Sequence, residues 1–353
     1  MSLLFYRLYY LPPVPLLGDS VKGLTTGRLA PGCNLCFSGL KTVIFITGVC
    51  DESCYYCPID MSRWGKRVIY VNEERATDLE AVVLEVQRQG AKGASITGGD
   101  PLADLPLVIR VIGALKEVMG SKFHVHLYTP GRYATPEALL SLWRAGLDEI
   151  RFHPVRPEYF KAIELATRLT GMRVGAEIPI APGLEAWAID VIKAVERAGG
   201  SFVNLNEMEF SDTNYDRLRV RGLAPSPSRY PAVRGALEAA MTVLRWASEN
   251  ASVPVHFCPA SYKSTFQVRN RFRVTARRDL AWYEAMTPDG LIARGEVISG
   301  DEVVDYFNPT QPPKPAQGYE YRVVVSYPTK AREPILCESA SPDPGEAVKG
   351  CLG

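Results

Sequence analysis

The chain has 353 residues, of which 46% are hydrophobic and 22% are charged. This length and composition predict a folded protein with one large domain or two smaller ones, and they exclude disordered, collagen-like and coiled-coil classes. The 40 basic residues balance 39 acidic ones. A net charge of +1 excludes a protein that is basic overall and binds nucleic acid for that reason, although it permits a local basic patch. No apolar stretch approaches the length of a transmembrane helix.

Short apolar strands alternate with amphipathic helices from residue 41 onward. We expect strands at 41–48, 93–97, 122–129, 148–153, 173–180, 202–207 and 253–258, and helices at 76–90, 105–119, 135–145, 157–170, 185–198 and 230–249. The β-branched and aromatic content of the strands is typical of parallel strands covered by helices. The alternation predicts an α/β fold, and six or seven units favour a partial (β/α)6-7 TIM-like barrel.

The chain is expected to have three regions. Residues 1–40 form an N-terminal extension, 41–260 form the barrel, and 261–353 contain a basic segment, a small C-terminal β appendage and a Pro-rich tail. A hairpin is predicted at 283–291, where Pro-Asp-Gly supplies the turn, and a further strand at 319–327. The last 25 residues are expected to be mobile.

Cysteines carry the clearest chemical signal, because five of the eight lie between residues 33 and 57. Cys50, Cys54 and Cys57 can supply three thiolates to a four-iron cluster and leave one iron open for a ligand. Alternatively, Cys33, Cys36, Cys54 and Cys57 have the spacing of a structural zinc site, which would leave Cys50 unused. Clustered metal-binding thiols in a chain of this size indicate a reducing compartment, so we expect a cytoplasmic protein.

Two motifs together resemble the radical S-adenosylmethionine (radical SAM) superfamily. The first is Cys50-x3-Cys54-x2-Cys57, and the second is Thr97-Gly98-Gly99-Asp100-Pro101-Leu102, similar to the glycine motif of that family with Asp in place of Glu. The resemblance covers about residues 30–280 and is strongest to an archaeal branch related to the pyruvate formate-lyase activating enzyme.

The resemblance implies a cofactor set and a reaction. Cys50, Cys54 and Cys57 would bind a [4Fe–4S] cluster whose open iron binds S-adenosylmethionine. The Tyr56 backbone would contact adenine, Gly98, Gly99 and Asp100 would approach the methionine group, and Glu177 is a candidate ribose contact. Reductive cleavage of S-adenosylmethionine would then release a 5′-deoxyadenosyl radical that abstracts hydrogen from a substrate. The electron donor would be of the ferredoxin or flavodoxin type.

Three other cysteines are expected near the barrel mouth. Cys33 and Cys36 precede the first barrel strand and Cys258 ends the last, so they could hold an auxiliary iron–sulfur cluster, with Cys337 as a fourth ligand if the appendage folds back. The alternatives are a zinc or redox pair formed by Cys33 and Cys36, or inert buried thiols.

Substrate contacts are sought among polar residues at the carboxyl ends of the strands, where barrel enzymes place their chemistry. The candidates are His126, His153, Asn206, Glu207, Lys263, Gln267 and Arg269. Lys263 and Arg269 open a run of six cations between residues 261 and 278, which either binds phosphate groups or forms a solvated surface helix. A histidine on a barrel strand is also often a hydrogen-bonded core group.

The sequence therefore predicts a radical SAM enzyme, with an RNA, a nucleotide or a phosphorylated metabolite as the substrate. A second hypothesis is activation of a glycyl-radical partner enzyme. A third, from another class, is a non-catalytic iron–sulfur or zinc protein, which the glycine motif and the barrel disfavour. No membrane association is expected.

Overall fold

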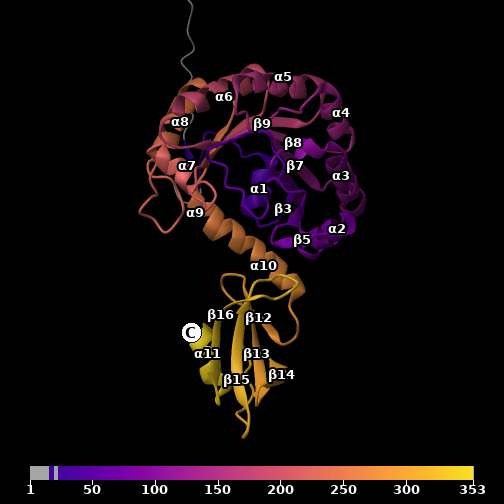
Figure 1. Cartoon of the computed structure of the whole chain (residues 1–353), viewed down its shortest axis with the longest axis vertical. Coiled ribbons are helices and arrows are strands. Elements are labelled where there is room, and N and C mark those ends of the chain that lie inside the picture. The colour runs from indigo at the N-terminus through magenta and orange to yellow at the C-terminus, as the bar shows by residue number, and fades with distance from the viewer. Residues whose placement is uncertain (1–15, 20–22, 353) are drawn as a thin grey trace, which may run out of the picture.

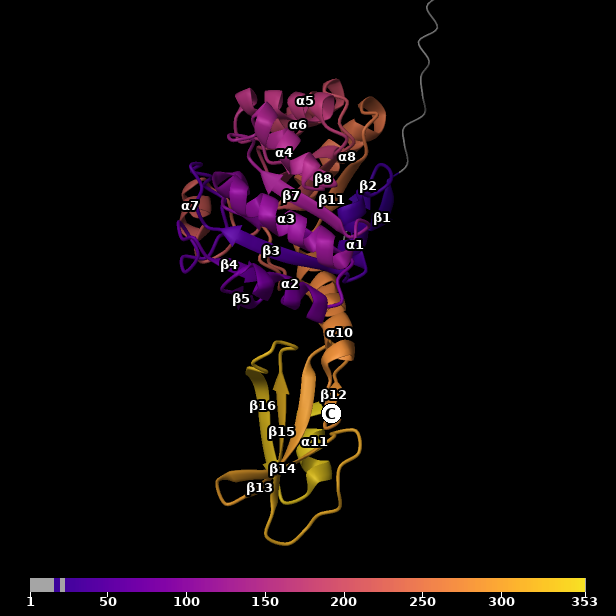
Figure 2. The same cartoon turned by 90° about the vertical axis from the view of Figure 1, so that its right-hand side faces the viewer.

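The computed structural model describes residues 16–19 and 23–352. Its larger part is a curved sheet ringed by helices, and a smaller antiparallel sheet is joined to it by one long helix (Figures 1 and 2). Within the described residues, none of the helices combines the length and apolar character needed to cross a bilayer.

Seven parallel strands form the centre of the large sheet, in the order β11-β10-β9-β8-β7-β6-β3. They are β3 (Lys41–Thr47), β6 (Gly93–Gly98), β7 (His124–Thr129), β8 (Glu149–Phe152), β9 (Arg173–Ile180), β10 (Phe202–Glu207) and β11 (Val255–Cys258). Antiparallel hairpins extend both edges: β1 (Leu17–Asp19) with β2 (Gly23–Thr25), and β4 (Ile69–Val71) with β5 (Glu74–Ala76). The strand order is an open path, so the predicted partial barrel is confirmed.

Helices cover the outer face of this sheet (Figure 1). They are α2 (Leu79–Arg88), α3 (Leu105–Met119), α4 (Pro136–Arg144), α5 (Phe160–Leu169), α6 (Glu185–Arg197) and α8 (Ala236–Asn250), with short turns η1 (Pro101–Asp104) and η2 (Pro157–Tyr159). Asp78, Asp104 and Thr135 cap three of them, each side chain accepting a hydrogen bond from a first-turn amide. Their apolar faces and the strands share one continuous core.

The helix expected at 230–249 starts later, at Ala236. Gly235 has a left-handed φ of 82°, and the preceding segment pairs with the loop after β10, where the Phe210 amide donates to the Pro231 carbonyl at 2.6 Å. The same loop contains a helix that the sequence did not predict, α7 (Tyr215–Val220).

A short helix, α1 (Pro31–Phe37), closes the N-terminal end of the barrel. Leu35 packs on Gly93, the first residue of β6, and β2 pairs with β11. The described part of the segment expected as a separate extension therefore completes the barrel.

The basic run forms α9 (Ala260–Tyr262), a π-helical turn η3 (Lys263–Gln267) and α10 (Val268–Asp279). Its residues Val268 and Arg271 line a small pocket together with Asn72 and Glu73, between β4 and β5. The helix then leads to the appendage (Figure 2). Most of its cations bind protein groups: Arg271 pairs with Glu73 at 2.5 Å, and Arg273 and Arg278 donate to backbone carbonyls. These three cations are therefore engaged by the protein itself.

The appendage is a five-stranded antiparallel sheet with a helix packed on it. Its elements are β12 (Glu284–Met286), β13 (Ile292–Ser299), β14 (Glu302–Phe307), β15 (Glu320–Ser326), β16 (Pro334–Ser341) and α11 (Pro344–Leu352). The predicted hairpin is confirmed, with Gly290 at a φ of 83° in the turn. The expected mobile tail is wrong, because β16 joins the sheet and α11 buries Ala347 in its core.

Candidate active site

A cavity of about 610 Å³ lies inside the barrel and brings together most of the predicted site residues. Those that line it are Cys33, Cys36, Cys50, Cys54, Tyr56, Cys57, Gly98, Gly99, His153, Glu177, Asn206, Glu207, Cys258, Lys263 and Gln267. Asp100 is buried behind the glycine turn, and Arg269 lies on α10 with its guanidinium 5.2 Å from the Phe266 ring. Cys337 falls in β16, and its side chain lies outside the described residues.

The predicted cluster cysteines lie on the loop that follows β3. Their side chains are half-buried, and burial raises the pKa of each thiol, to about 11 for Cys54. No three acidic, histidine or cysteine ligand atoms of this described loop lie within 4.8 Å of one another.

Residues from α7 and the turn before it donate hydrogen bonds to the backbone of this loop. The Asn214 side chain donates to the Tyr56 carbonyl at 2.9 Å, and the Arg217 guanidinium donates to the carbonyls of Cys54 at 3.3 Å and Cys57 at 3.4 Å. Sequence reasoning missed both residues, because no motif connects them to carbonyls about 160 positions away.

Glu52, inside the cysteine motif, was also missed. Its side chain is almost fully buried, accepts a hydrogen bond from Tyr159 at 2.5 Å, and pairs with Arg156 at 3.3 Å and Arg132 at 3.5 Å. The loop is therefore tied to the barrel at both of its faces.

The glycine turn after β6 packs directly against the cysteine loop. A Cβ atom on Gly98 would lie 2.2 Å from the Thr47 carbonyl oxygen, and one on Gly99 would lie 2.2 Å from that of Val49 and 2.9 Å from the Cys50 Cβ. The glycines are therefore required by the close approach of these two segments.

Asp100 is only 1% exposed, and its Oδ1 accepts hydrogen bonds from Thr129 at 2.8 Å and the Leu102 amide at 3.1 Å. Its Oδ2 has no hydrogen-bond partner among the described residues. Burial is the main reason why its pKa is raised to about 6, and the nearby Glu52 and Asp51 add to the effect.

Glu177 is at the centre of a buried polar network. It accepts hydrogen bonds from Arg151 at 2.6 Å, Asn204 at 2.8 Å and Asn206 at 2.8 Å. Burial alone would raise its pKa, but Arg151 and the two amides outweigh it and lower the pKa to about 2. Both carboxylate oxygens are thus already bonded, which disfavours the predicted ribose contact.

His153 lies in the cavity wall in a fixed orientation. Its Nδ1 lies 2.9 Å from the Glu177 carbonyl and its Nε2 lies 2.9 Å from the Tyr56 hydroxyl. A carbonyl can only accept, so Nδ1 carries the proton and Nε2 accepts from Tyr56.

His126, by contrast, does not reach the cavity. It is fully buried on β7 beneath α1, so the expectation that it contacts substrate near the mouth is wrong. Alternation along the strand places His124 and His126 on one face but does not specify their depth in the barrel.

Cys33, Cys36 and Cys258 converge on the deeper part of the cavity. The Asn204 side chain donates to the Cys33 sulfur at 3.3 Å, and burial foremost, with Cys36 and Cys33 nearby, raises the pKa of Cys258 to about 12. His256, on the same face of β11 as Cys258, also lines this region. Both of its ring nitrogens lack hydrogen-bond partners among the described residues.

Lys41, the first residue of β3, adds a buried cation to the same region. No described carboxylate lies within ion-pair distance of its ammonium group. Burial would lower its pKa, but Cys36 and Tyr128 outweigh that effect and raise it, so the group stays charged. Lys263 differs, because it pairs with Glu209 at 2.5 Å.

Glu207 accepts a hydrogen bond from the Ala260 amide at 2.7 Å, at the start of α9. Among the predicted substrate contacts, Lys263 and Gln267 line the cavity, whereas Arg269 does not. Among the described residues, the cations that line this cavity are Lys41, Arg151 and Lys263.

Comparison with known proteins shows the family of the chain. The Radical SAM superfamily matches residues 44–154. A Methanocaldococcus jannaschii protein, named for a proposed role as a glycyl-radical enzyme activating enzyme, is 36% identical over 285 residues, covering 78% of this chain and 75% of that protein. The chain belongs to the radical SAM superfamily, and it is an enzyme that uses a [4Fe–4S] cluster and S-adenosylmethionine.

A GTP 3′,8-cyclase from Heliobacterium modesticaldum is 29% identical over 155 residues, covering 42% of this chain and 45% of the cyclase. Among solved structures, Streptococcus suis SuiB bound to S-adenosylmethionine has a TM-score of 0.43 at 12% identity, covering 62% of this chain and 50% of SuiB. Escherichia coli coproporphyrinogen III oxidase has a TM-score of 0.37 at 12% identity, covering 62% of this chain and 56% of the oxidase. The chain thus spans about half the length of these structures.

Proposed function

We propose that Cys50, Cys54 and Cys57 bind the radical SAM cluster, and that Gly98, Gly99, Asp100 and the Tyr56 backbone bind S-adenosylmethionine. Three observations support this assignment: the free thiols line the cavity, the glycine turn lies against their loop, and the buried Asp100 Oδ2 lacks a partner among the described residues. An ammonium group, such as that of methionine, suits such an oxygen. When bound and reduced, the cluster supplies the electron that converts S-adenosylmethionine to a 5′-deoxyadenosyl radical.

An auxiliary iron–sulfur cluster is proposed at Cys33, Cys36 and Cys258. The three thiols share one cavity with the first cysteine set, and this is the observation that carries the proposal. Lys41 would compensate the negative charge of thiolates there. His256 is a better candidate than Cys337 for the fourth ligand of this cluster. Its ring lines the cavity, and both ring nitrogens lack hydrogen-bond partners among the described residues.

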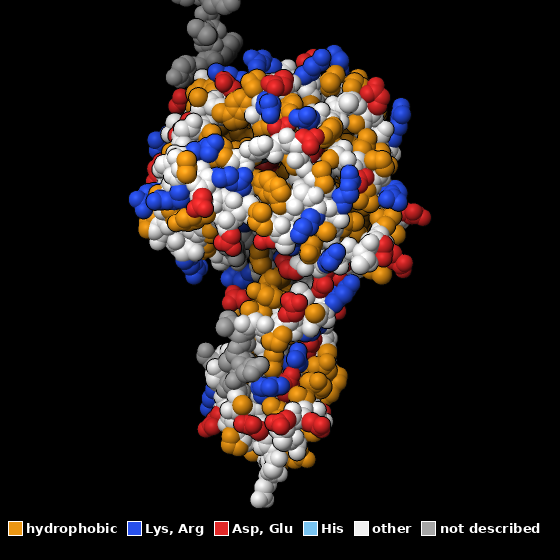
Figure 3. Space-filling view, viewed as in Figure 1, with side chains coloured by type: hydrophobic (Ala, Val, Ile, Leu, Met, Phe, Trp, Pro, Cys, Tyr) orange, Lys and Arg blue, Asp and Glu red, His pale blue; other side chains and the backbone are white. Residues whose placement is uncertain are grey.

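The substrate proposed is a small anionic molecule, such as a nucleotide or a phosphorylated metabolite, enclosed between the two cysteine sets. Lys41, Arg151 and Lys263 face that space. RNA is less well supported, because Arg271, Arg273 and Arg278 of α10 bind protein groups and the face in Figure 3 shows acidic and basic side chains interspersed. The electron donor would be a ferredoxin- or flavodoxin-type protein in the cytoplasm.

Activation of a glycyl-radical enzyme is the second candidate. The name of the Methanocaldococcus relative favours it. The second cysteine set argues against it, because abstraction of hydrogen from a peptide backbone does not need a second cluster.

Iron analysis and reductive cleavage of S-adenosylmethionine test the proposal in protein purified without air. The wild type should bind six to eight irons per chain, that is, about two clusters, and form 5′-deoxyadenosine when reduced. Cys54→Ala should abolish 5′-deoxyadenosine formation, whereas Cys258→Ala should retain it and lose about one cluster of iron. Unchanged iron in Cys258→Ala would refute the auxiliary site. A glycyl radical detected by electron paramagnetic resonance after mixing with a glycyl-radical enzyme would favour the second candidate.

A further inference from the structure

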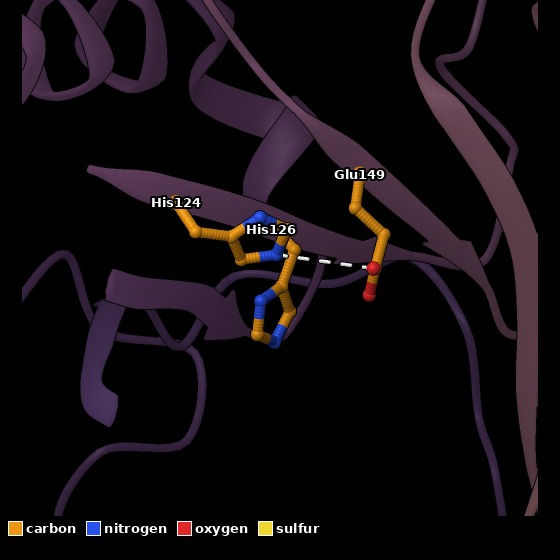
Figure 4. Close-up of side chains that lie close together, drawn as sticks. All are labelled: His124, His126 and Glu149. Atoms are coloured by element: carbon orange, nitrogen blue, oxygen red, sulfur yellow. Dashed lines mark ion pairs between the residues drawn. The ribbon is translucent and has the colours of Figure 1, made fainter. Parts of the chain in front are cut away.

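Two buried side chains and one partly exposed one meet near the N-terminal end of the barrel, outside the cavity. His124 and His126 come from β7 and Glu149 from the adjacent strand β8, and Figure 4 shows the two imidazoles and the carboxylate grouped together. One ligand atom from each lies within 4.8 Å of the other two, and His124 Nε2 is 3.8 Å from Glu149 Oε2. Two metal bonds of about 2.1 Å at a tetrahedral angle separate their ligand atoms by about 3.4 Å.

The group leaves buried polar atoms without hydrogen bonds. His126 and Glu149 are both 0% exposed. Among the described residues, neither nitrogen of His126, nor His124 Nε2, nor Glu149 Oε2 has a hydrogen-bond partner. Buried nitrogen and carboxylate atoms are costly in this state, and a cation that they coordinate would remove the cost.

A second layer of contacts fixes the carboxylate. Arg151 engages Glu149 Oε1 through Nε at 2.6 Å and Nη2 at 2.5 Å, which leaves Oε2 directed at the histidines. Metal-binding carboxylates are commonly held by hydrogen bonds in this way. The same guanidinium also pairs with Glu177 at 2.6 Å, so one cation is shared by two carboxylates.

Helix α1 covers the group. A Cβ atom on Gly32 would lie 2.5 Å from the His126 Cε1, so only glycine permits this close packing. His124, whose side chain is 15% exposed, forms the outer edge. The residues flanking it, Lys116 and Asp148, pair with each other at 2.7 Å and leave the local charge unchanged.

We propose that His124, His126 and Glu149 bind one divalent transition-metal ion, for which zinc is the representative. Two imidazoles and one carboxylate are a ligand set that such ions prefer. Through Arg151, the ion would fix the position of Glu177 in the reaction cavity. This site shares no ligand with the cysteine sites and does not depend on the proposed function.

Zinc binding to the cluster-loaded protein tests the proposal. Protein purified without air is treated with a chelator and then titrated with zinc alone, and bound zinc and iron are measured by mass spectrometry. The wild type should take up about one zinc per chain, and His124→Gln and His126→Gln should not take up this zinc. Asp148→Asn is the matched control, since it removes an adjacent acid that is not a ligand, and its zinc uptake should be unchanged.

Thermal unfolding gives an independent readout. Zinc should raise the midpoint of the wild type and of Asp148→Asn but not that of either histidine variant, because a ligand that binds only the folded state stabilises it. Retained iron content and circular dichroism show that each variant is folded. If His126→Gln does not fold, His124→Gln, at the exposed edge of the site, is the variant used for the test. Equal zinc uptake and equal midpoint shifts in the wild type and the folded histidine variants would overturn the proposal.

Discussion

The Tyr56 hydroxyl and His153 Nε2 lie 2.9 Å apart and connect the cysteine loop to the far wall of the cavity. His153 is in turn fixed by the Glu177 carbonyl, also at 2.9 Å. Since burial lowers the pKa of His153, the imidazole is neutral at physiological pH and Nε2 is an acceptor. These two hydrogen bonds therefore connect β9, the strand that bears Glu177, to the cysteine loop.

Tyr56→Phe tests this coupling. The variant leaves His153 Nε2 buried without a donor, so the free energy of unfolding should fall by about 1–3 kcal/mol. Tyr55→Phe is the control, because no hydrogen bond of the Tyr55 hydroxyl is found among the described residues, and its effect should stay below about 0.5 kcal/mol. Denaturant titration measures both, and equal losses would contradict the assignment.

Arg217 should determine how firmly the cysteine loop holds the proposed cluster. Arg217→Ala removes the donors to the Cys54 and Cys57 carbonyls, so the iron should be lost to a chelator roughly 10-fold faster, as expected from about 1.5 kcal/mol of lost bonding. Arg219→Ala, on the same helix, removes an exposed contact to the Leu223 carbonyl and should leave the rate unchanged. Anaerobic absorbance decay gives both rates. Equal rates would show that Arg217 does not stabilise the loop.

The sequence predicted the barrel strands well, because each carries its own apolar pattern over six or so residues. It also predicted that Cys50, Cys54 and Cys57 follow the first barrel strand and that the glycine turn follows the second, since each motif lies within a few consecutive residues. The tail was misjudged because its Pro and Gly content was given more weight than the apolar residues that pack α11 on the small sheet.

Long-range contacts could not be predicted in this way. Arg217 and Asn214 donate hydrogen bonds to backbone carbonyls, and every residue type has a backbone carbonyl, so the sequence does not indicate these partners. The burial of Lys41, the first residue of β3, could not be predicted, because it depends on α1 closing that end of the barrel. The depth of His126 depends on how the strands tilt and pack, which alternation along one strand does not record.

Asp100 should make stability depend on pH in a distinctive direction. Its pKa is raised to about 6 in the folded state, so between the unfolded and folded values the native chain binds more protons and stability falls as the pH rises. Relative to Asp100→Asn, the wild type should lose about 1.4 kcal/mol between pH 5 and pH 8. Denaturant titrations across this range, without S-adenosylmethionine, provide the measurement. A difference that is constant with pH would show that Asp100 titrates normally.

Gly99 and Gly113 provide a matched pair for the packing of the glycine turn. In Gly99→Ala the new methyl group would clash with the Val49 carbonyl and the Cys50 Cβ, so the turn and the cysteine loop must separate. We expect a loss of about 1–3 kcal/mol in the free energy of unfolding and a large loss of 5′-deoxyadenosine formation. Gly113 lies within α3, and a methyl group added there would meet no described atom within 4 Å, so Gly113→Ala should stabilise the chain by about 0.5–1 kcal/mol. Unfolding and activity assays on both variants separate the two cases, and an active Gly99→Ala enzyme would show that the loop does not depend on this contact.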